Sequence, residues 1–145
     1  MGIREIIGAA TLGVSLFGCA TGYHSTGATG GFQETQLGPA IYQVRFNGNA
    51  YTSNDRASEF LMRRCAEVAL EHGKRYFVLK SSDSVSETSF GYRFPSREAV
   101  IQVLDEARDD SLDAVIIIDE TADRAHGQMS AAAARTYREF KAAHQ

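Results

Sequence analysis

The sequence predicts an α+β domain in which helices pack on one face of a small sheet. Three patterns indicate this class: strict apolar–polar alternation over 41–47, helical spacing of apolar residues over 55–72, and short apolar runs at 76–79 and 99–104. With further helix patterns at 110–125 and from Ser130 onward, the elements follow the order β-α-β-β-α plus a C-terminal helix. Elements in this order suit helices packed on one face of a sheet.

The first strand and the start of the first helix are marked by alternation and by capping residues. Residues 41–47 read IYQVRFN, so Tyr42, Val44 and Phe46 share one face of a half-buried strand. The pattern ends at Gly48. Side-chain oxygens that could cap the following helix belong to Thr52, Ser53 and Asn54.

The first helix is predicted over 55–72. Its apolar stripe consists of residues at helical spacing, namely Ala57, Leu61, Cys65, Val68 and Ala69. Gly73 follows, and glycine readily takes the left-handed conformation that ends a helix. His72 falls in the last turn, where a cation favours the helix dipole.

The later elements are a strand at 76–79, a strand at 99–104 and two helices. Residues 110–125 fit two structures, because the β-branched quartet at 115–118 favours a strand, whereas apolar spacing behind polar capping residues favours a helix. We expect the helix. The Ala-rich run that begins at Ser130 is also predicted to be helical.

Composition describes one soluble domain without a nucleic-acid surface. The chain has 145 residues, the size of a single compact domain. Apolar residues make up 43% and charged residues 23%, which excludes a wholly disordered or polytopic membrane protein. The net charge is −3, so no basic excess draws the chain to nucleic acid. Two cysteines cannot build a disulfide framework.

The first 19 residues have the features of an exported, lipid-anchored protein. Residues 6–18 carry no charge and would span about 20 Å as a helix, less than the roughly 30 Å of a hydrocarbon core. A run of this length is typical of a secretory signal peptide. The segment Leu16-Phe17-Gly18-Cys19 resembles the lipobox of bacterial lipoproteins, which implies cleavage before Cys19 and acyl chains on its thiol and its new amino terminus. The alternative is a buried amino-terminal helix that ends in cysteine.

The chain is therefore divided into four parts. Residues 1–18 are the expected lipoprotein signal peptide, and 19–38 are the lipidated cysteine with a Gly- and Thr-rich tether, spanning on the order of 20–25 Å. Residues 39–127 form the single α+β domain, and 128–145 form the C-terminal helix. Ala20 stands where Asp holds Gram-negative lipoproteins at the inner membrane, so the resemblance implies the outer membrane, with the domain facing the periplasm.

Residues 30–79 carry a family resemblance. They combine the segment GFQETQL at 31–37 with a strand and a helix closed by Glu-His-Gly at 71–73, before an aromatic pair at 76–77. Together with the lipobox, this combination resembles a family of small Gram-negative envelope lipoproteins of uncharacterised function. The resemblance covers about a third of the chain. It implies an envelope location and no particular activity.

No catalytic, cofactor-binding or metal-binding residue is predicted. A catalytic thiol needs a base within reach, and His72 lies two helical turns from Cys65, about 10 Å along the axis. Cys65 also lies in the apolar stripe, so we expect it in the core. The four histidines lack metal-ligand spacing, and no nucleophile elbow or phosphate-binding loop is present.

The most acidic stretch is 105–123, with eight acids and one base, Arg108. Five of its residues match positions 1, 3, 5, 8 and 12 of an EF-hand loop, namely Asp109, Ser111, Asp113, Ile116 and Glu120. Ala114 stands where that loop needs glycine. We therefore expect a solvated charged face, which the basic residues within 56–80 could neutralise across the domain surface.

Two functions follow from these features. The first is a lipid-anchored, non-enzymatic binding or structural module whose partner is an envelope protein or the cell wall. Its expected contact surface is the exposed helix face with Arg56, Arg63 and Arg64. The second is a periplasmic hydrolase or metal-dependent enzyme, which a cleft with a pKa-shifted acid or histidine would favour.

Overall fold

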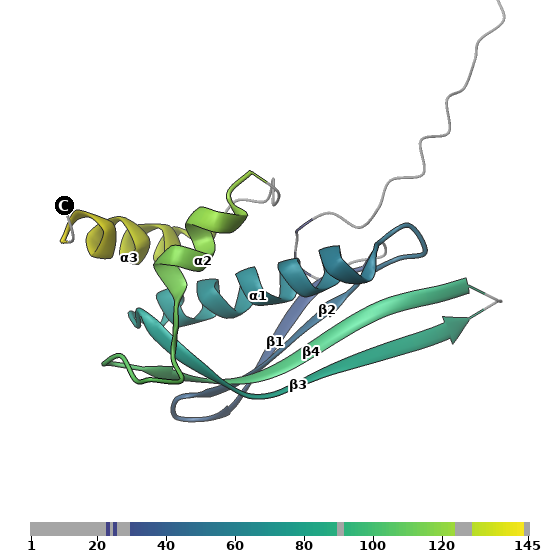
Figure 1. The fold of residues 1–145 in the computed structure, drawn as a ribbon, viewed down its shortest axis with the longest axis horizontal. Coiled ribbons are helices and arrows are strands. Elements are labelled where there is room, and N and C mark those ends of the chain that lie inside the picture. Colours follow the sequence, from purple (N-terminus) through teal and green to yellow (C-terminus); the bar gives the residue numbers. More distant parts are fainter. Residues whose placement is uncertain (1–22, 24, 26–29, 90–91, 124–128, 144–145) are drawn as a thin grey trace, which may run out of the picture.

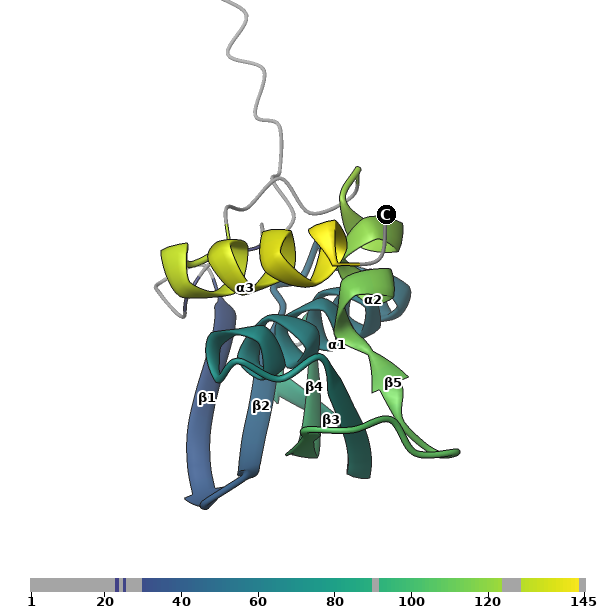
Figure 2. The same ribbon diagram turned by 90° about the vertical axis from the view of Figure 1, so that its left-hand side faces the viewer.

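The computed structural model describes residues 23, 25, 30–89, 92–123 and 129–143, without the side chains of 85–89 and 92–93. It confirms the α+β class. A five-stranded antiparallel sheet is covered on one face by a long helix, and two shorter helices pack on the far side of that helix (Figures 1 and 2). The expected signal peptide and Cys19 lie outside the described residues.

The sheet has the strand order β1-β2-β4-β3-β5. Its strands are β1 (Gly31–Gly38), β2 (Ile41–Asn47), β3 (Tyr76–Ser89), β4 (Tyr92–Leu104) and β5 (Leu112–Asp113). All neighbouring strands are antiparallel. The inward face of β2 carries Tyr42, Val44 and Phe46, which are 5%, 0% and 0% exposed, so the predicted strand and its buried face are confirmed.

Strand β1 corrects the predicted boundary of the tether. Residues 31–38 were expected in the tether, but they pair with β2 along its whole length, from Gly31 opposite Asn47 to Gly38 opposite Ile41. The strand is hard to recognise because its burial pattern is mostly exposed and its inward positions include Glu34. The folded domain therefore begins before residue 39.

Strands β3 and β4 are longer than the apolar runs that predicted them. Beyond the end of β2, which lies opposite Ser96, they continue as a two-stranded ribbon to the pair Ser89 and Tyr92. Figure 1 shows this ribbon projecting past the helices. Its β3 half is rich in serine, which predicts a loop, yet antiparallel pairing with β4 satisfies its backbone groups.

The first helix, α1 (Asn54–Glu71), has the predicted caps. Ser53 accepts a hydrogen bond from the Arg56 backbone N–H at 3.2 Å. Gly73, at φ +72°, takes the left-handed conformation that ends the helix. His72 is the C-cap residue, and its ring stacks on Tyr42 with centroids 4.4 Å apart.

The second and third helices are α2 (Ala114–Thr121) and α3 (Ala131–Ala142). The helix expected within 110–125 is confirmed in a shorter form, because Asp113 caps it by accepting from the Val115 backbone N–H at 2.9 Å. Ser130 caps α3, as its sequence predicts. Ala133 is fully buried in the common core, so the C-terminal helix is part of the same packed unit. No helix in the described ranges is long and apolar enough to cross a membrane.

Candidate functional site

Cys65 is a core residue, as its place in the apolar stripe predicts. It is 0% exposed and is part of the cluster that also contains Leu61 and Val68. Burial raises the pKa of the Cys65 thiol to about 12, which the charge of Arg64 only partly opposes. A thiol that stays protonated and out of solvent at neutral pH cannot serve as a nucleophile.

We predict that the Cys65 thiol is unreactive in the native protein. We also predict that it makes the folded protein less stable at alkaline pH. The unfolded thiol ionises near pH 8.5–9, about three pH units below the folded one, so the folded state holds an extra proton between these values. Its contribution to stability is complete below about pH 8 and falls by up to about 1.4 kcal/mol per pH unit above pH 9.

Denaturant midpoints of the 20–145 chain at pH 8 and pH 10 test this, with the Cys65→Ala variant as the reference. The wild-type midpoint should fall more steeply than that of the variant, and native labelling of the thiol at pH 8 should be slow. Rapid labelling, or equal pH dependence in both chains, would place Cys65 outside the core.

Arg63 and Arg64 correct the expected contact surface. Both were expected on an exposed helix face, but each is 5% exposed. The prediction was wrong because α1 is covered on two sides, by the sheet and by α2 and α3 (Figure 2). Of the three arginines in that prediction, Arg56 alone remains exposed, with its guanidinium carbon 5.4 Å from the Phe60 ring centroid.

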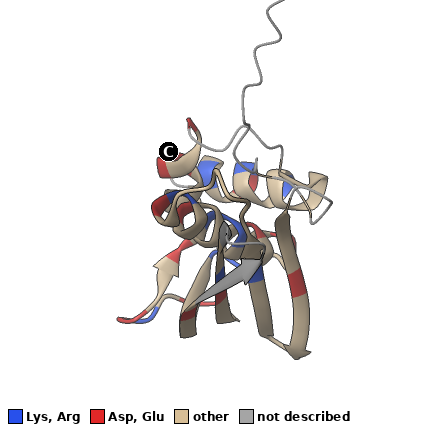
Figure 3. Cartoon of the chain, turned by 90° about the vertical axis from the view of Figure 1, so that its right-hand side faces the viewer, with Lys and Arg blue, Asp and Glu red and all other residues tan. Residues whose placement is uncertain are grey.

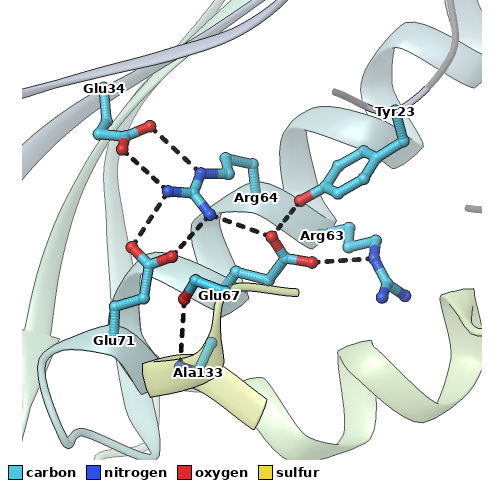
Figure 4. Close-up of polar contacts among 8 residues, drawn as sticks. Tyr23, Glu34, Arg63, Arg64, Glu67, Glu71 and Ala133 are labelled. Carbon is cyan, nitrogen blue, oxygen red and sulfur yellow. Dashed lines mark hydrogen bonds and ion pairs between the residues drawn. The ribbon is translucent and has the colours of Figure 1, made fainter. Parts of the chain in front are cut away.

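The buried arginines belong to an ion cluster around Glu67, which is 1% exposed (Figure 4). The Glu67 carboxylate accepts hydrogen bonds from the Tyr23 hydroxyl at 2.5 Å, from Arg63 Nε at 3.1 Å and from Arg64 Nη1 at 3.0 Å. Arg63 also donates to Thr121 of α2 at 3.1 Å. Glu67 therefore connects α1 to the amino-terminal segment directly and to α2 through Arg63.

Arg64 is the other centre of this cluster. Its guanidinium donates to both oxygens of Glu34 on β1, at 2.9 and 3.2 Å, and to both oxygens of Glu71, at 2.9 and 3.0 Å. It also lies over the Phe32 ring, 4.6 Å from the centroid. Burial alone would lower the pKa of Arg64, but the hydrogen bonds and charges of Glu34 and Glu71 raise it, so the group is permanently charged.

Tyr23 closes the cluster from the amino-terminal side. It is 7% exposed, and its ring centroid lies 5.1 Å from that of Phe32 and 5.4 Å from that of Phe60. Burial, followed by the negative charge of Glu67, raises the pKa of the Tyr23 hydroxyl well above its usual value. The phenol is thus a permanent hydrogen-bond donor and not a proton-transfer group.

The sequence did not predict this cluster. Tyr23 and Glu34 fall in the segment that was assigned to the tether. The signal that could have revealed the cluster is the spacing of Arg64, Glu67 and Glu71 on α1, at i, i+3 and i+7, within a helix that is otherwise apolar on that side. Charged side chains at such positions are buried only when they are paired.

The acidic stretch at 105–123 does not form an EF-hand loop, because residues 114–121 are helical. Several of its acids form ion pairs instead. Asp105 pairs with Lys74, Asp113 with Arg75 at 2.8 Å, and Asp119 with Lys141 at 2.8 Å. The first two pairs join the acidic stretch to the basic one. Figure 3 shows acidic and basic residues mixed over the helices and the sheet.

Two described carboxyl groups have shifted pKa values, and both shifts are downward. Hydrogen bonds from Arg45 and then Gln43 lower the pKa of Glu98, and those from Lys141 and then Tyr137 lower that of Asp119. A general acid would need a raised pKa. In the described part of the chain, no group of three or more His, Cys, Asp or Glu side chains could hold a metal ion.

Two shallow hollows lie on the described surface. One is on the outer face of the sheet and is lined by Gln33, Thr35, Gln43 and Arg45. The other lies at the start of α1 and is lined by Thr52, Ser53, Asn54 and Pro95. Neither set of lining residues combines a nucleophile with a base, and Ser53 is already used as the helix cap.

Comparison with protein-family models, curated proteins and solved structures finds no match to the chain.

Proposed function

We propose that the chain is a lipid-anchored envelope lipoprotein with a small, non-enzymatic binding or structural domain. Acyl chains on Cys19 would hold it at the outer membrane, with the domain in the periplasm and an envelope protein or the cell wall as its partner. The observation that carries the proposal is the uncharged run at 6–18 that ends in Leu16-Phe17-Gly18-Cys19. Two or three acyl chains anchor stably, since each buried methylene contributes about 0.8 kcal/mol.

The chemistry of the domain supports a non-enzymatic role. Among its buried titratable groups, Tyr23, Arg63 and Arg64 all donate to Glu67, and Cys65 is held protonated in the core. Through Thr121 and Glu34, which accept from Arg63 and Arg64, this cluster links α1 to α2 and β1, and Tyr23 links it to the amino-terminal segment. A network of this kind fixes the arrangement of elements, which suits a domain that presents a rigid surface.

Incorporation of a tagged palmitate in a Gram-negative host tests the proposal. The wild-type chain should take up the label and fractionate with the outer membrane. Cys19→Ser should lose the label, because no thiol remains at the acylation position. Cys65→Ser is the matched control, since it removes the other cysteine and should keep the label. Label retained by Cys19→Ser would contradict the proposal.

A further inference from the structure

The position of Tyr23 limits how far the domain can stand from a lipid anchor. Tyr23 is fixed in the domain by its hydrogen bond to Glu67 and by the rings of Phe32 and Phe60. Cys19 precedes it by four positions. Four residues of fully extended chain span at most about 14 Å. A free tether over 19–38 would instead span on the order of 20–25 Å.

We propose that the face of the domain that holds Tyr23 is its membrane-facing surface, and that the bilayer carrying the anchor is its occupant. This proposal rests on the proposed function, because it requires acyl chains on Cys19. The chain between Cys19 and Tyr23 therefore keeps Tyr23 within about 14 Å of the anchor. A helix with its side chains is about 10–12 Å across, so at most one layer of protein fits between Tyr23 and the bilayer. The domain then lies at the headgroups rather than free in the periplasm.

We call the contacts that hold Tyr23 in the domain the Tyr23 clamp, and they leave the residue buried. Its ring is 7% exposed, and the Arg63 guanidinium lies 5.4 Å from its centroid. Its hydroxyl donates to a carboxylate that is itself buried, so withdrawal of Tyr23 would leave Glu67 short of a donor. Ser25 adds a single parallel bridge to Phe32, close to the same site.

One exposed basic side chain lies beside this site. Arg56 is exposed and lies over the Phe60 ring, which is itself in edge contact with Tyr23. A basic side chain close to the bilayer attracts anionic headgroups. Arg56 therefore lies where it can contact phospholipid phosphates when Tyr23 is held near the anchor.

A pair of matched insertions tests the proposal. Ten Gly and Ser residues are inserted between Gly22 and Tyr23 in one chain, and the same ten between Ala28 and Thr29 in the other. The first insertion lengthens the chain between the anchor and the clamp, and the second lengthens the chain behind it. Both full-length acylated proteins and the wild type are placed in supported bilayers of phosphatidylethanolamine and phosphatidylglycerol, and neutron reflectometry measures the water layer between headgroups and protein.

The wild type and the second chain should show the same thin layer, no more than about 14 Å. The first chain should show a layer thicker by about 10–20 Å. Tyr23→Ala should make the two insertions equivalent, and Tyr51→Ala, a change at an exposed tyrosine, should have no effect. Equal thickening by both insertions in the wild-type background would overturn the proposal.

Failure of the proposed function gives a different result. A chain without acyl groups shows no acyl mass and leaves no protein layer on a washed bilayer. If the protein is acylated but the water layer is equally thick in all variants, the result contradicts the membrane-facing surface and leaves the lipid anchor supported.

Discussion

Replacing Glu67 with alanine is expected to lower the free energy of unfolding by about 3–5 kcal/mol. Glu67 is 1% exposed and accepts from Tyr23, Arg63 and Arg64. Its removal leaves the guanidiniums of Arg63 and Arg64, each 5% exposed, with fewer negative partners. It also removes the hydrogen-bond acceptor of the buried Tyr23 hydroxyl. A buried charge without its partner lowers the free energy of unfolding by more than the intact pair raises it, because water cannot solvate that charge.

Urea unfolding of the 20–145 chain measures this loss. Glu139→Ala is the matched control, because Glu139 is an exposed glutamate in the middle of a helix and its replacement should change stability by no more than about 0.5 kcal/mol. If Glu67→Ala lost less than about 1 kcal/mol, the cluster would not be the buried network described above.

Leu61→Ala is expected to cost about 2–5 kcal/mol, because it removes a buried side chain between α1 and the sheet and leaves a cavity. Leu61 is 4% exposed and lies in the core cluster with Val44 and Phe46. Cys65→Ala, in the same stripe, removes only a sulfur atom and should cost about 1 kcal/mol.

The matched control for Leu61 is Ile116→Ala on α2, since Ile116 is 53% exposed. That change should stay within about 0.5 kcal/mol of the wild type. Denaturant midpoints and slopes of the variants are compared at one pH. Equal losses at Leu61 and Ile116 would contradict the assignment of the α1 stripe to the core.

The sequence predicts the elements whose burial follows a simple period. The alternation of Tyr42, Val44 and Phe46 predicts β2, and the spacing of Leu61, Cys65 and Val68 predicts the face of α1 that meets the sheet. In these elements one face is apolar and the other is polar, so periodicity and burial agree.

The prediction fails where the residues that join the helices and the sheet are polar. Glu34 lies on the helix-facing side of β1, where Arg64 neutralises its charge. Because the strand carries a charged residue on that side and is mostly exposed, its sequence predicts a solvated tether. Arg63 and Arg64 were predicted to form an exposed basic face for a similar reason. Arg63 donates to Thr121, 58 positions away, and Arg64 donates to Glu34, 30 positions away. The pairing exists only in the folded chain.

Intact-mass analysis of the mature protein from a Gram-negative host tests the central claim most directly. Cleavage before Cys19 predicts a chain of 145 − 18 = 127 residues with the added mass of acyl chains confined to its amino-terminal cysteine. A species that retains Met1, or one cleaved elsewhere with a free Cys19 thiol, would contradict the lipid anchor.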